Sequence, residues 1–114
     1  MSKAVPESTS DRRTSKRVNY RTQGNLVTPS GDWFVYVINL SINGALIALI
    51  EPHDIRQGTL VTLHLELNDG SNLIMHGEIA HSKEHYIGLS CQPHSEQDRQ
   101  ALKQLIDHLS PLEF

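Results

Sequence analysis

Apolar and polar residues along the chain divide it into three parts. Residues 1–11 are rich in serine and polar side chains, with Pro6 and almost no apolar content, so we expect a disordered tail. From residue 18 onward, short apolar runs alternate with turn residues. This pattern predicts strands over residues 18–27, 33–40, 45–50, 60–68, 72–81 and 86–91. After Pro93 the apolar spacing becomes helical.

The strand over residues 60–68 has the clearest alternation. One face would carry Val61, Leu63, Leu65 and Leu67, and the other Thr62, His64, Glu66 and Asn68. A period of two is typical of a strand with one buried face. The following Asn68-Asp69-Gly70-Ser71 segment predicts a hairpin that leads into the next strand.

The last part of the chain predicts an amphipathic helix over about residues 96–109. Its apolar positions recur at helical spacing, namely Ala101, Leu102, Leu105, Ile106 and Leu109. Ser95 and Asp98 have the spacing of an N-terminal cap. Six short strands and one helix predict a mainly β fold, a six-stranded antiparallel β-barrel with a C-terminal α-helix and a flexible N-terminal arm. The helix would cover a barrel opening or an edge.

Composition is that of a small soluble protein. A chain of 114 residues, 38% hydrophobic and 20% charged, predicts one domain, and we place it at residues 12–114. The apolar run over residues 45–50, which no other run exceeds, is too short to span a bilayer, and the first ten residues lack the apolar core of a secretory signal. The single Cys91 excludes an intramolecular disulfide. We therefore expect a cytoplasmic protein with no membrane contact.

Charge is distributed unevenly. Residues 1–21 carry +4, from Lys3, Arg12, Arg13, Lys16, Arg17 and Arg21 against Glu7 and Asp11, whereas the net charge of the whole chain is −3. A basic arm, residues 12–21, is thus attached to an acidic body. Such an arm either binds an anion or lies on its own domain.

Catalytic and metal-binding patterns are absent from the sequence. His81 and His85 are four residues apart, but Ser82-Lys83-Glu84 between them predicts a turn, and no cysteine pair accompanies them. Cys91, at the end of an apolar strand, is expected to be buried and inert. We expect neither a metal site nor an enzyme.

Two polar segments have the chemistry of a ligand site. Arg13 and Arg17 are separated by three residues, and guanidinium groups bind phosphate and stack on flat rings. Residues 39–44 form a polar bend between two apolar runs, with Asn39 and Ser41 as hydrogen-bonding groups and Gly44 allowing either a positive φ or a close backbone approach. Alone, the first segment is a solvated basic tail and the second an ordinary turn. Their co-occurrence favours a site.

Together these segments resemble the signature of the PilZ domain family. That signature is an RxxxR motif followed by [D/N]xSxxG, on a six-stranded barrel with a C-terminal helix. Here Arg13-xxx-Arg17 is followed, after 21 residues, by Asn39-x-Ser41-x-x-Gly44. The resemblance covers nearly the whole chain after about residue 11.

The resemblance implies binding of cyclic di-GMP, a bacterial second messenger. Arg13 and Arg17 would contact phosphates and guanine faces, Asn39 and Ser41 would hydrogen-bond guanine, and Gly44 would keep the turn compact. An arginine before the motif, here Arg12, accompanies an intercalated ligand dimer in PilZ-like proteins, which implies two ligand molecules per site. Binding would order the arm over the barrel and change a surface that an unidentified downstream protein reads.

Two alternatives stay open from the sequence. One is a protein-interaction adaptor with a silent ligand site. The other is a barrel that grips single-stranded nucleic acid with its basic arm, although the acidic body and an aromatic content of 5% argue against it.

Overall fold

Six antiparallel strands close into a barrel in the order β1-β2-β3-β6-β5-β4. The computed structural model describes residues 17–109. The elements are β1 (Val18–Thr28), β2 (Gly31–Ser41), β3 (Gly44–Ala48), β4 (Leu60–Glu66), β5 (Asn72–Lys83), β6 (Tyr86–Pro93) and α2 (Glu96–Leu109). The predicted six-stranded barrel with a C-terminal helix is therefore confirmed.

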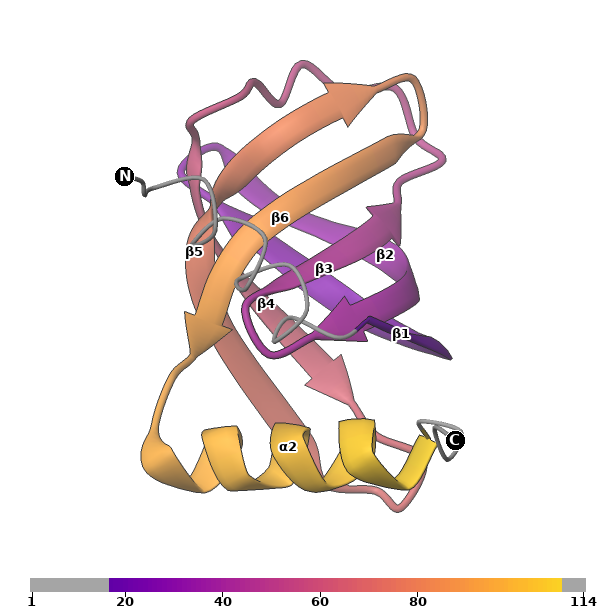
Figure 1. The fold of residues 1–114 in the computed structure, drawn as a ribbon. Helices are drawn as coiled ribbons and strands as arrows, with labels where there is room; N and C mark the ends of the chain where they lie inside the picture. The colour runs from indigo at the N-terminus through magenta and orange to yellow at the C-terminus, as the bar shows by residue number, and fades with distance from the viewer. Residues whose placement is uncertain (1–16, 110–114) are drawn as a thin grey trace, which may run out of the picture.

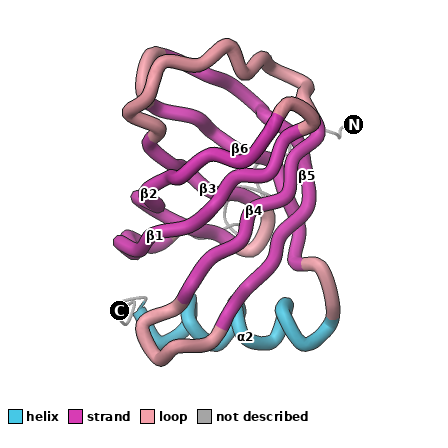
Figure 2. Tube along the Cα trace, turned by 180° about the vertical axis from the view of Figure 1, so that it is seen from behind, coloured by secondary structure: helices cyan, strands magenta, loops and turns pink. Residues whose placement is uncertain are grey.

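The barrel leaves no sheet edge for the helix to cover, because β1 pairs with both β2 and β4 and so completes the ring. The helix instead lies across one end of the barrel (Figure 1). The view from behind shows it at the same end, with the long β3–β4 connection at the opposite end (Figure 2). Of the two expected positions for the helix, the structure selects the barrel opening.

The barrel interior is filled by alternate apolar side chains of every strand. The predicted inner face of residues 60–68 is confirmed, since Val61, Leu63 and Leu65 of β4 and Leu67 just after it are all buried. On α2, Leu102 and Ile106 are buried, whereas Leu109 at the end of the helix is exposed. The helix closes the core from below with one apolar stripe.

The predicted cap of α2 is also confirmed. The backbone N–H of Asp98 donates to Ser95 Oγ over 3.1 Å, and that hydroxyl donates to Asp98 Oδ2 over 3.1 Å. The cap satisfies a backbone N–H that has no partner within the first turn of a helix.

Two turns are shorter than the sequence predicted. Only Ile42 and Asn43 lie between β2 and β3, so most of the expected bend over residues 39–44 belongs to the strands. β5 continues to Lys83, and the turn to β6 is Glu84-His85, with Glu84 at a φ of 57°. Cross-strand pairing overrides the polar character of these strand ends. None of the helices among residues 17–109 is long and apolar enough to cross a membrane.

Candidate functional site

The β2–β3 hairpin carries all three residues of the predicted NxSxxG motif. Asn39 and Ser41 belong to β2, Gly44 begins β3, and the register pairs Ser41 with Gly44 and Asn39 with Leu46. A bulge between Val37 and Asn39 shifts the pairing there. Bulges redirect side chains next to binding sites, and this one lies just before the motif.

Arg17 and Asn39 are in direct contact. The Arg17 Nη1 donates to Asn39 Oδ1 over 2.8 Å, although the two residues are 22 positions apart. Arg17 is placed there because Val18 begins β1, whose Asn19 pairs with Asn39 across the β1–β2 ladder. The structure thus joins the second arginine of RxxxR to the hairpin motif. Arg12 and Arg13 lie outside the described residues.

Ser41 is fully buried rather than directed to solvent. Its hydroxyl donates to Asn43 Oδ1 over 3.1 Å and approaches the Gly44 carbonyl oxygen at 3.4 Å. These bonds fix the conformation of the Ile42-Asn43 turn. In this arrangement Ser41 supports the turn that presents Asn39, and its contact with a ligand remains a prediction.

Gly44 is required by a close approach between strands. Its φ is not positive, because the glycines with positive φ are Gly31, Gly58 and Gly70. A Cβ at Gly44 would instead lie 2.8 Å from the Leu89 carbonyl oxygen of β6. The same Cβ would lie 3.5 Å from Ser41 Oγ and 3.6 Å from Arg17 Nη2. Of the two reasons for glycine that the sequence left open, the structure supports the second.

A hollow of about 560 Å³ opens beside these residues, and we call it the signature pocket. Its lining comprises Arg17, Asn39, Asn43, Gly44, Ala45, Leu46, Ala80, His81, Gly88, Leu89 and Ser90. This volume is within the range of small-ligand sites. The pocket combines a guanidinium, amides and an imidazole on a floor of small or aliphatic residues, which suits a flat, polar, anionic ligand.

His81 is a pocket residue that the sequence did not indicate. It pairs with Gly88 across the β5–β6 ladder, and its ring lies against the Gly88 backbone in the place that a Cβ would occupy. A register shift between Ile79 and His81 brings the two residues opposite each other. Because strand pairing sets this register shift, the spacing of residues along the chain could not predict that His81 lies beside Gly88.

Burial and the positive charge of Arg17 have opposite effects on the pKa of the Cys91 thiol. Burial raises the pKa of the Cys91 thiol from 9.0 to about 12, and the nearby positive charge of Arg17 opposes part of that rise. Cys91 is buried and free, as the sequence predicted for an inert thiol. Within residues 17–109, no cluster of three or more His, Cys, Asp or Glu side chains is placed to hold a metal ion.

Comparisons with known proteins identify the family. The family model described as "PilZ domain" matches residues 11–108. Among solved structures, the chain is similar to the PilZ domain of CeSA from a cellulose synthesizing bacterium, with a TM-score of 0.67 and 18% sequence identity. That likeness covers 83% of this chain and 98% of the other, and at this identity it shows the shared fold. A search of curated proteins finds no match. The barrel, the two motifs and the family match together place this chain in the PilZ domain family.

Proposed function

We propose that this PilZ domain is a receptor for cyclic di-GMP, which binds at the signature pocket. The observation that carries this proposal is the 2.8 Å hydrogen bond between Arg17 and Asn39, since it joins the two motifs at the rim of a ligand-sized hollow. PilZ domains generally bind this nucleotide. They are binding domains rather than enzymes.

Each motif residue has a proposed role that fits its chemistry. Arg17, with Arg13, contacts phosphates and guanine faces through its guanidinium. Asn39 hydrogen-bonds a guanine edge, and Ser41 is assigned the same role or, from its buried position, holds the turn that orients Asn39. Arg12 accompanies a second ligand molecule. Because Asn39 Oδ1 already accepts from Arg17, the ligand exchanges one existing hydrogen bond for several new ones.

The proposed output is a change of surface. Phosphates of the ligand neutralise Arg12, Arg13 and Arg17, and the segment before β1 folds over the barrel beside Asn39. Residues 18–21 of the expected arm already belong to β1, so they take no part in this step. A downstream protein reads the new surface. Ordering the arm has an entropic cost, so the affinity is moderate for the number of contacts. We propose that ligand binding and the change of surface take place in the cytoplasm.

Calorimetric titration with cyclic di-GMP tests the proposal, with GTP and a single-stranded oligonucleotide as controls. Arg17→Gln and Asn39→Ala are each expected to weaken binding about 10-fold or more, because a hydrogen bond to a charged group contributes about 1.5–3 kcal/mol. Arg99→Gln, an exposed arginine on α2, is the matched control and should bind as wild type does. Unchanged binding by Arg17→Gln would refute the site.

The same titration separates the alternatives. Wild-type protein that gives no heat with cyclic di-GMP would instead support the adaptor with a silent site. Binding of the oligonucleotide that falls steeply with salt would support the nucleic-acid barrel.

A further inference from the structure

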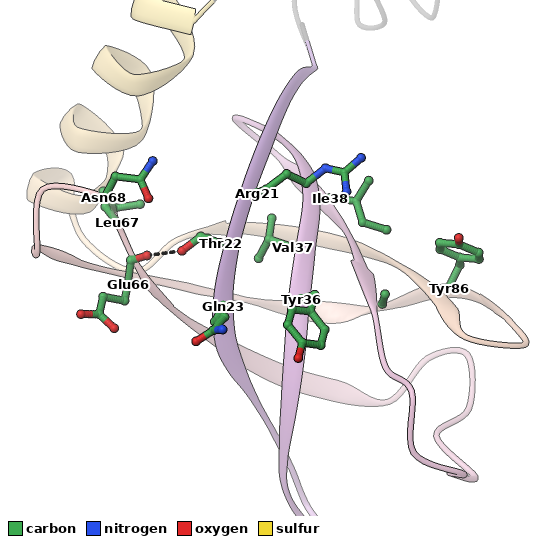
Figure 3. Close-up of a pocket in the computed structure, with 11 residues that line it drawn as sticks. Arg21, Thr22, Gln23, Tyr36, Val37, Ile38, Glu66, Leu67, Asn68 and Tyr86 are labelled. Atoms are coloured by element: carbon green, nitrogen blue, oxygen red, sulfur yellow. Dashed lines mark hydrogen bonds between the residues drawn. The ribbon is translucent and has the colours of Figure 1, made fainter.

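A second hollow, of about 730 Å³, opens on the outer face of the barrel (Figure 3). We call the part of it formed by Arg21, Tyr36, Ala48 and Tyr86 the tyrosine site. None of these four residues belongs to either PilZ motif. Their combination of two aromatic rings, a cation and a small residue calls for its own explanation.

The tyrosine site adjoins the signature pocket along β3. Leu46 lines the signature pocket and Ala48 the tyrosine site, and both point outward from β3, while Ile47 between them is fully buried. Residues two apart on a strand are separated by about 7 Å. The two hollows are therefore lined by residues about 7 Å apart on β3, a distance that one nucleotide base can span.

The two tyrosines flank Ala48 across three strands. The register pairs Tyr36 of β2 with Ala48 of β3, and Ala48 with Tyr86 of β6. The outer strands are then about 10 Å apart, and a flat ring stacked between two others needs about 7 Å. Because the alanine methyl group is small, the space between the tyrosines stays open for a planar group.

Both rings are unusually exposed for their size, with 44% of Tyr36 and 53% of Tyr86 accessible to solvent. Phe34 contacts Tyr36 in a T-shaped pair, with ring centroids 5.1 Å apart and an interplanar angle of 83°. Such a contact occupies at most one face of the Tyr36 ring, so it orients the ring and leaves the other face available for stacking.

Arg21 supplies the positive charge of the tyrosine site. Its side chain extends from β1 toward Ile38 of β2 (Figure 3). Glu66 also lines the hollow, but its carboxylate is directed away from Arg21, on the far side of β1 (Figure 3). A guanidinium beside tyrosine rings suits a nucleotide, because the rings can stack on its base and the cation can bind its phosphate.

We propose that the tyrosine site is a second nucleotide-binding site, which stacks a guanine ring on Tyr36 and Tyr86 over Ala48 and holds a phosphate with Arg21. This proposal rests on the proposed function, since the guanine has one of two sources. It belongs to an additional cyclic di-GMP molecule, or it is the second base of a molecule that is bound in the signature pocket.

Calorimetric titration of Tyr36→Ala, Tyr86→Ala and Arg21→Gln with cyclic di-GMP tests the proposal. If the base belongs to an additional molecule, each tyrosine variant binds one cyclic di-GMP molecule fewer per chain than wild type does. If it belongs to the first molecule, the stoichiometry stays constant and each tyrosine variant binds about 5- to 100-fold more weakly, the range for loss of one stacked base. Either result supports the site and identifies the source.

Conservative and remote substitutions complete the test. Tyr36→Phe and Tyr86→Phe keep the rings and should bind as wild type does. Leu60→Ala is the remote control and should also bind as wild type does, because it removes an exposed side chain of β4 that lines neither pocket. Circular dichroism of each variant checks the fold. Unchanged affinity and stoichiometry in folded tyrosine variants would overturn the proposal and favour a protein-binding role for these rings. A wild type that binds no cyclic di-GMP would instead overturn the proposed function itself.

Discussion

Gly44→Ala tests whether the hairpin motif is kept glycine by steric contact. The new methyl carbon would lie 2.8 Å from the Leu89 carbonyl oxygen, and real Cβ atoms essentially never approach an atom that closely. This oxygen belongs to the β3–β6 ladder, where Leu89 pairs with Ala45, so it cannot rotate away as a side chain would. The two strands must separate by several tenths of an ångström.

The magnitude follows from two opposing effects. Overpacking of this kind costs about 1–3 kcal/mol. Alanine recovers about 0.4–1 kcal/mol by restricting the unfolded chain, since the φ at this position is one that alanine tolerates. We expect a net loss of about 1–2 kcal/mol, which lowers the Tm by about 4–8 °C per kcal/mol in a domain of this size. Urea and thermal unfolding followed by circular dichroism measure it.

Gly70→Ala is the matched control. Nothing lies within 4 Å of a Cβ there, but its φ of 90° makes alanine strained, so it also loses about 1–2 kcal/mol of stability. The two variants differ at the signature pocket, because only the Gly44 methyl group would lie near Ser41 Oγ and Arg17 Nη2. Cyclic di-GMP binding should therefore weaken in Gly44→Ala alone. A Gly44→Ala protein as stable as wild type would refute the steric argument, and equal binding by both variants would refute its link to the pocket.

Three further predictions concern the core and the helix. At pH 8, alkylation of Cys91 should be roughly 1,000-fold slower in native than in urea-unfolded protein, because a pKa raised to about 12 leaves so little thiolate. Because folding raises this pKa, the contribution of the protonated thiol to stability is complete below pH 9.0 and is lost as the pH rises toward 12. Urea titrations across that pH range measure the loss. Ser95→Ala should cost about 1 kcal/mol by removing the cap on Asp98 N–H, and Ser95→Asp should restore most of it. Leu102→Ala, at a fully buried position, should cost about 2–5 kcal/mol in urea unfolding, whereas Leu109→Ala at the exposed end of the helix should change stability by under about 1 kcal/mol.

Most of the fold was readable from local patterns. The alternation in β4 identified Val61, Leu63 and Leu65 as core residues, and the helical spacing after Pro93 gave α2 its observed bounds. Both patterns arise because one face of an element must be apolar wherever it packs on a core. The predicted ends of the strands were less accurate. Polar side chains at the ends of β2 and β5 indicated turns, but pairing with a neighbouring strand extends the ladder there.

Only part of the candidate site could be predicted from the sequence. The sequence identified Arg17, Asn39 and Gly44 through a motif, but it could not show that Arg17 already bonds to Asn39. It also could not show that the structure buries Ser41, the residue expected to hydrogen-bond guanine. Such facts depend on the register of strands that are far apart in the chain, and register is fixed by packing across the whole barrel.

The sequence by itself determined the barrel, the C-terminal helix and the two motifs, because local spacing records which side chains are buried and the motif residues stand in order along the chain. Only the tertiary structure decided which residues share the outer face of the barrel. It set His81 against Gly88 beside the motif, and it aligned Tyr36 and Tyr86 on either side of Ala48. These neighbours come from four different strands, so no spacing along the chain could have brought them together.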